Sequence, residues 1–366
     1  MQHDHGLACN SYTQSPVRTG YEQVIAQRTS DTFAFAARKD GRVISRNNTG
    51  LIIEYEDGTR KGVEIGRRFG QAAGLTVPHD VVCQVKAGDV FKKGDVLTYN
   101  SGFFEKDILN PNNVVWKNGL TVKTILYESS QTLEDASSIS KRLSEKLTTK
   151  LTKIKTLVVT FDQQIRNIVN VGDHVEPDTV LCIIEDAVTS NSNLFDEDSL
   201  NTLKLLSGQS PSAKEKGVID KIEVFYNGDK DDMSDSIREL TNTTDREMSK
   251  ASRSFGKNPF TGRVTDSFRV DSDPLGIDTA AIRIYITSDV IGGVGDKIVF
   301  CNQMKSVISE VMTTDMITES GDIIDAVFGQ ASIEARVVTS PSVIGTTNTI
   351  LSVIGKKAVQ IFKGVK

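Results

Sequence analysis

Two lysines eight residues apart, Lys297 and Lys305, are the side chains of this sequence best suited to holding phosphate groups. They lie in VGDKIVFCNQMKSVIS, after the β-branched run AAIRIYITSDV and a Gly-Gly pair. A lysine about 4 Å from a phosphate gains roughly 4 kcal/mol at an effective dielectric near 20, against about 1 kcal/mol in water. Two such cations on one wall could hold polyphosphate or a nucleic-acid backbone. The plainer alternative is a pair of solvated surface charges.

An acidic pair, Glu134-Asp135, is the second candidate. It follows NGLTVKTILYESSQTL and opens a segment, 133–148, for which the sequence predicts a helix ending near Lys146. Two interpretations stay open. The acids either stabilise the positive end of a helix dipole or face a metal-bound triphosphate.

The motifs of several other kinds of active site are missing from the sequence. The sequence has no GxxxxGK[ST] phosphate loop, no GxGxxG fingerprint and no GxSxG elbow. Its four cysteines have neither CxxC nor zinc-ligand spacing. Asp271-Ser272-Asp273 precedes a proline and is typical of a turn, so no metal site is expected in this chain. No apolar run is long enough for a membrane span, and the net charge of −5 excludes a uniformly basic nucleic-acid coat.

The elements that must position these residues are predicted to be mainly β-strands with some helices, an α+β class. Short β-branched runs alternate with Gly, Asn and Asp turns. Helices are predicted over 133–148, about 230–250 and about 301–312, and a polar loop over 186–216. Gly-Asp pairs at 88–89, 172–173 and 295–296 predict tight turns in which Gly takes a positive φ and Asp closes the turn with its side chain. The neighbouring Val90 and Val175 are expected in the core of a barrel.

Read in order, these segments resemble the C-terminal half of the β subunit of multisubunit DNA-directed RNA polymerases. The resemblance rests on collinear motifs that touch most of residues 1–360, each weak alone. They are the MQHDH…RTGYE start, VKAGDVFKKGDVLTYN, Asn118-Gly119 with LEDAS, residues 169–184, GVIDKIEVFYNG and GDKIVFCNQMKSVIS. The last keeps both lysines in register with the family motif GDKMAGRHGNKGVIS.

The resemblance implies a double-psi β-barrel with flap- or wall-like insertions. Residues 1–150 would form the first part of the barrel region and 151–275 the insertion. Residues 276–366 would form the second part of the barrel and the start of the hybrid-binding segment. The truncation at both ends is most like the split β subunits of giant bacteriophage polymerases.

The resemblance also implies roles. Lys297 and Lys305 would hold RNA or NTP phosphates opposite a catalytic Mg²⁺ bound by an aspartate cluster of a partner β′-like subunit. Glu134 and Asp135 would lie near the triphosphate, and Gln2 near the RNA–DNA hybrid. The partners implied are the N-terminal part of β, the β′ parts, a promoter-specificity subunit, template DNA, nascent RNA and NTPs, without a membrane. The expected location is the cytoplasm of an infected bacterial host, with packaging in the virion as the alternative.

The chain departs from the family pattern around the second lysine. Phe300, Gln303 and Ser306 replace glycines, and Cys301-Asn302 replaces Arg-His. Val343 stands where the family has an arginine, so a nucleotide-phosphate contact is either lost or supplied elsewhere. Two other functions stay open: a scaffold barrel subunit without catalysis, and a biotinyl or lipoyl carrier, since GDVFKKGDVL resembles the turns of such domains.

Overall fold

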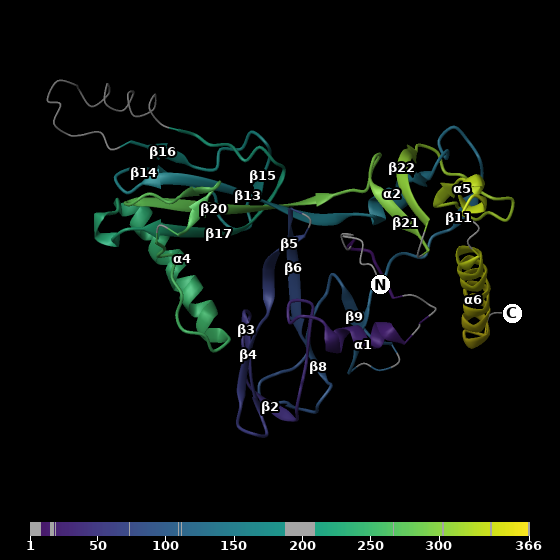
Figure 1. Cartoon of the computed structure of the whole chain (residues 1–366), viewed down its shortest axis with the longest axis horizontal. Coiled ribbons are helices and arrows are strands. Elements are labelled where there is room, and N and C mark those ends of the chain that lie inside the picture. Colours follow the sequence, from purple (N-terminus) through teal and green to yellow (C-terminus); the bar gives the residue numbers. More distant parts are fainter. Residues whose placement is uncertain are drawn as a thin grey trace. The chain divides into compact units, whose positions relative to one another are not determined.

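The computed structural model describes residues 9–14, 18, 20–72, 74–108, 110, 112–186, 209–265, 267–301, 304–336 and 339–364. They group into two compact units (Figure 1). The first unit takes its residues from Met1–Thr29, Ser101–Thr149 and Val290–Lys366; the second takes them from Ser30–Asn100 and Lys150–Asp289. The predicted segments 1–150, 151–275 and 276–366 stay a prediction.

The second unit consists mainly of antiparallel strands. Its largest sheet has eight strands in the order β1-β8-β6-β13-β20-β17-β15, with β5 paired to β6. Their bounds are β1 Ala34–Ala36, β5 Gly66–Ala72, β6 Leu75–Cys83, β8 Val96–Asn100, β13 Thr149–Thr160, β15 His174–Val175, β17 Gly217–Asn227 and β20 Thr279–Val290.

Smaller sheets complete this unit. A four-stranded sheet has the order β4-β3-β2-β7, and two further pairs are β14-β16 and β18-β19. Their bounds are β2 Gly41–Arg46, β3 Gly50–Tyr55, β4 Arg60–Glu64, β7 Val90–Phe91, β14 Gln164–Arg166, β16 Ile183–Glu185, β18 Arg269–Val270 and β19 Asp273–Pro274. Asp271 and Ser272 have positive φ between β18 and β19, which confirms the predicted turn.

The long helix of the second unit is the one predicted near 230–250. A short 3-10 helix (Lys230–Asp232) leads into α4 (Asp235–Ser254), whose inner side buries Ile237. The end of α4 comes so close to Gly50 that a Cβ there would lie 2.3 Å from the Ser254 carbonyl oxygen. Only glycine permits this approach of helix and strand.

The first unit contains the predicted site residues. Its five-stranded mixed sheet has the order β11-β23-β12-β22-β21, with a separate β10-β9 pair. The bounds are β9 Phe104–Lys106, β10 Val114–Trp116, β11 Thr124–Leu126, β12 Ala136–Ser140, β21 Lys297–Phe300, β22 Met304–Met312 and β23 Ala326–Phe328. The helices are α1 Tyr21–Arg28, α2 Lys141–Lys146, α5 Gln330–Glu334 and α6 Ser340–Phe362.

Two predicted helices of this unit are wrong in whole or in part. The helix predicted near 301–312 is strand β22: its apolar residues have a helix-like spacing, but its burial alternates, with Met304, Ser306 and Ile308 buried and Lys305 and Val307 exposed. The helix predicted over 133–148 begins only at Lys141, after strand β12. The Ser140 hydroxyl accepts the Leu143 N–H at 3.1 Å and so caps its start.

The predicted Gly-Asp turns are confirmed, and Gly94-Asp95 adds a fourth. Gly88, Gly172 and Gly295 have φ of 92°, 98° and 92°. In each turn the aspartate carboxylate accepts the N–H of the residue three positions earlier. The distances are 2.7 Å at Asp89, 2.8 Å at Asp95, 2.7 Å at Asp173 and 2.8 Å at Asp296.

The expected barrel core is only partly supported. Val175 is 2% exposed, but Val90 is 81% exposed, because it follows its turn on the outer side of β7. The α+β class is confirmed. Within the described ranges the sheets form no closed barrel, so the double-psi barrel stays a prediction.

These turns make a stability prediction. Gly172→Ala should lower the free energy of unfolding by about 1–2 kcal/mol, because an L-residue is strained at positive φ while nothing lies within 4 Å of its new Cβ. The matched control is Gly345→Ala in α6, which also has open space and should be neutral or stabilising. Denaturant titration checks both; equal midpoints for the two variants would contradict the assignment.

Candidate functional site: a lysine hairpin

Lys297 and Lys305 lie on one face of the hairpin formed by β21 and β22. The antiparallel register pairs Lys297 with Val307 and Val299 with Lys305. Residues directly opposite each other share a face, and so do residues two apart on a strand. The two lysines are therefore diagonal neighbours, at a typical spacing of about 7–8 Å.

The opposite face of the same hairpin is the core of the unit. Phe300, Met304 and Ile308 are at most 8% exposed and pack with Ile139 and Phe328. The lysine face is solvent-accessible: both lysines are exposed, and the valines between them are 48% (Val299) and 41% (Val307) exposed. Alternation along the strands thus anchors the hairpin on one side and presents two cations on the other.

The Gly-Asp turn before β21 fixes the register of Lys297. The Gly295 N–H donates to the Ile308 carbonyl at 2.8 Å, and the Ile308 N–H donates to the Asp296 carbonyl at 2.9 Å. These bonds hold the start of β21 against β22. Phe300 and Ser306, two of the positions where the sequence departs from the motif it resembles, are both buried.

The acidic pair lies beside the same strand. β12 runs parallel to β22 with Ala136 opposite Val307, and the Val307 N–H donates to the Asp135 carbonyl at 3.0 Å. Glu134 and Asp135 have φ of 48° and 68°. The segment is thus a left-handed bend at the entry of a strand, and the interpretation as helix N-terminal acids is wrong.

The Asp135 carboxylate binds Arg336 in a two-pronged ion pair. The hydrogen bond from Arg336 lowers the pKa of Asp135 below its ordinary value. The Asp135 N–H also donates to the Ser332 hydroxyl at 3.2 Å. Sequence reasoning missed Arg336, since no local motif marks it and 201 residues separate it from Asp135.

Helix α5 is held against the same loop. The Glu128 carboxylate accepts the Ala331 N–H at 2.6 Å, and the Tyr127 N–H donates to the Phe328 carbonyl at 3.0 Å. The Glu128 carboxylate at the start of α5 and the Asp135 carboxylate beyond the end of α5 together determine the position of Arg336. Arg336 remains 44% exposed, so its outer side is accessible to a ligand.

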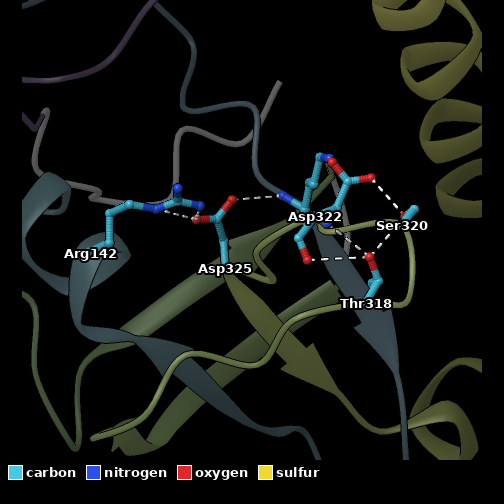
Figure 2. Close-up of polar contacts among 6 residues, drawn as sticks. Arg142, Thr318, Ser320, Asp322 and Asp325 are labelled. Carbon is cyan, nitrogen blue, oxygen red and sulfur yellow. Dashed lines mark hydrogen bonds and ion pairs between the residues drawn. The ribbon is translucent and has the colours of Figure 1, made fainter.

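A second polar cluster braces the far strands of the sheet (Figure 2). The Asp325 side chain, 9% exposed, accepts Arg142 Nε at 3.1 Å and the Lys123 N–H at 2.9 Å. Asp322 pairs with Lys123, and its N–H donates to the Thr318 hydroxyl at 3.0 Å. All these carboxylate oxygens have protein partners, so the cluster serves to fix β23 beside β11 and β12.

Gln2 lies outside the described residues, as do Asn302 and Gln303 and most of the predicted loop 186–216. Among the described residues no group of three or more His, Cys, Asp or Glu side chains could hold a metal ion. Within that part of the chain no helix is long and apolar enough to cross a membrane.

No protein-family model matches the chain, and no curated protein matches its sequence.

The Asp135–Arg336 pair makes a titration prediction. Because Arg336 stabilises the ionised carboxylate, Asp135 should titrate below 3.8, its ordinary pKa. Any stability from the pair is present above that pH and is lost as the pH falls through the lowered pKa. Carboxyl ¹³C NMR measures this directly. Arg336→Gln should return the Asp135 pKa toward 3.8, and an unchanged midpoint would show that the pair is absent in solution.

Proposed function

We propose that this chain is a subunit of a DNA-dependent RNA polymerase, most like a split β subunit of a giant bacteriophage enzyme, and that it acts only in an assembled complex. The observation that carries the proposal is the pair of lysines on one exposed hairpin face. The sequence motifs follow the order found in the β subunit of RNA polymerase. This exposed face carries positive charges suited to binding phosphates.

The lysine face suits a polyanion better than it suits a metal. Lys297 and Lys305 repel a divalent cation, whereas a phosphate bridging them contacts both ammonium groups across their diagonal spacing. The role assigned to them is to hold the RNA 3′-terminal phosphate or the NTP phosphates by charge and position. In this proposal Mg²⁺, bound by aspartates of a β′-like partner, neutralises the charge that develops during phosphoryl transfer.

In this proposal Arg336 is a third cation assigned to the phosphates. It is attached through Asp135, whose backbone binds Val307, the residue paired with Lys297. A guanidinium donates in a planar fork, and Asp135 occupies only part of it. Arg336 therefore offers the phosphate contact that Val343 cannot make. Asp135 then orients the arginine rather than facing a metal itself.

The proposal predicts the effect of removing both lysines. Lys297→Ala with Lys305→Ala should leave assembly intact, because both side chains point away from the core, and should slow nucleotide addition by about 10²-fold or more. The assay is single-nucleotide extension of an RNA primer by the complex purified through a tag on this chain. The matched control, Lys141→Ala with Lys146→Ala, removes two exposed lysines of α2 and should extend at the wild-type rate.

Wild-type extension by the assembled double-lysine variant would contradict the role of the hairpin. A purified complex that contains no β′-like chain and extends no primer would favour the scaffold alternative. Intact mass of this chain tests the carrier alternative, because a biotinyl or lipoyl group on Lys305 would add a fixed mass.

A further inference from the structure

Helix α4 (Asp235–Ser254) of the second unit carries three cations along its solvent side. Arg246, Lys250 and Arg253, here called the basic stripe, follow one another at steps of four and three residues, and all three are exposed. They lie within about 60° of one another around the helix axis and repeat about once per turn. The opposite side of the helix packs on β3, β14 and β17, with Ile237 fully buried. Packing therefore directs the basic stripe to solvent.

The stability of the helix does not explain the basic stripe. Among the residues that the structure describes, its three cations have no ion pair, and the exposed Glu247 beside them binds none of them. Like charges three or four residues apart destabilise a helix. The helix dipole favours cations only in the last turn, which accounts for Arg253 but not for Arg246. An anion bound along the helix would relieve this repulsion.

An exposed phenylalanine is held beside the basic stripe. After α4 the chain turns back, and residues 260–262 run along the helix in the opposite direction. The Ser249 hydroxyl donates to the Phe260 carbonyl at 2.9 Å, and the Gly262 N–H donates to the buried Asp245 carboxylate at 2.7 Å. Ser249 is three residues from one arginine of the stripe and four from the other, so it lies next to both. The Phe260 side chain is 54% exposed.

Arg263 adds a cation on the helix side of the sheet. It forms a parallel bridge with Tyr226 of β17, and residues paired across two strands share a face. The Tyr226 ring lies on the helix side, because its hydroxyl donates to the Asp245 carboxylate at 3.1 Å. Arg263 is exposed and has no ion pair within the described ranges. The basic stripe, Arg263 and Phe260 thus lie on one side of this sheet.

This combination suits a single-stranded nucleic acid. Cations in a row hold the phosphate backbone, and an aromatic ring beside them stacks on an unpaired base. The basic stripe extends over about 10 Å of helix, so it is too long to converge on one isolated phosphate. An acidic protein segment would bind the cations but would not use the ring for stacking.

We propose that the basic stripe, together with Arg263 and Phe260, is a binding surface for single-stranded nucleic acid, either RNA or DNA. The cations contact phosphates along the strand, and Phe260 stacks on one base. The inference goes beyond the proposed function, because this surface holds a strand and takes no part in nucleotide addition. It uses residues of the second unit alone and does not depend on the lysine hairpin.

The test is fluorescence anisotropy of the full-length chain with labelled single strands of about 16 nucleotides, oligouridine RNA and oligothymidine DNA, over about 50–200 mM salt. The parent is Lys297→Ala with Lys305→Ala, so that the hairpin does not contribute. Adding Arg246→Ala, Lys250→Ala and Arg253→Ala should weaken binding more than about tenfold. The salt dependence should fall by about 2 in logarithmic slope, because each phosphate contact contributes about 0.7. The strand that binds more tightly identifies the source.

Phe260 is tested through stacking rather than charge. Phe260→Ala should weaken binding about tenfold with an unchanged salt slope, and Phe260→Trp should retain it. A strand of the same length without bases should bind the parent about as weakly as the intact strand binds the Phe260→Ala variant. The substitution should then have no further effect on the strand without bases. These readouts distinguish stacking on a base from attraction to any polyanion, such as an acidic protein.

A matched control removes three exposed lysines elsewhere in the same unit. Lys86→Ala with Lys92→Ala and Lys93→Ala makes the same change in net charge and should bind like the parent. Circular dichroism verifies that all variants fold. The proposal is overturned if the parent binds no single strand, if a duplex of equal length binds more tightly, if the control loses as much affinity as the stripe variant, or if Phe260→Ala binds like the parent. Each of these results leaves the primer-extension test of the lysine hairpin unaffected.

Discussion

The candidate site depends on the two-residue alternation of strand β22 between its neighbours β21 and β12. One set of its side chains, which includes Met304 and Ile308, enters the core, and the other set, which includes Lys305 and Val307, reaches solvent. Pairing with β21 brings Lys297 onto the same side, and pairing with β12 brings in the Asp135 segment. A shift of one residue in the β21–β22 register would place the two lysines on opposite faces.

The pairing of β22 with the segment before β12 also explains the position of the Asp135 carboxylate. Because the Asp135 carbonyl is engaged by the Val307 N–H, its carboxylate is fixed relative to the hairpin, and it in turn fixes Arg336. Strand β22 thus positions the two lysines, and its N–H bond to the Asp135 carbonyl holds the loop whose carboxylate pairs with Arg336. Two lysines held in place in this way need not be rearranged when a polyanion binds, which is the condition for charge to stabilise a reaction step.

The sequence predicted the features that are determined by residues close together in the chain. The Gly-Asp turns follow from the positive φ of Gly172 and Gly295 and from a carboxylate three residues beyond its donor, so they could be read directly. Strand β22 was predicted as a helix because a nine-residue stretch with Met, Val and Ile is compatible with either period until its partners are known. The Asp135–Arg336 pair could not be predicted, because it joins a loop and a helix end that meet only in the folded sheet.

The central claim is that the lysine face holds phosphates of the RNA or the nucleotide. Its most direct test is a cryo-electron microscopy structure of the complex purified through this chain, bound to a DNA template, an RNA primer and a non-hydrolysable NTP. In that structure the Nζ atoms of Lys297 and Lys305 should lie about 3 Å from phosphate oxygens, the usual length of a charge-assisted hydrogen bond. Phosphates bound only elsewhere, with this hairpin face open to solvent or covered by protein, would contradict it.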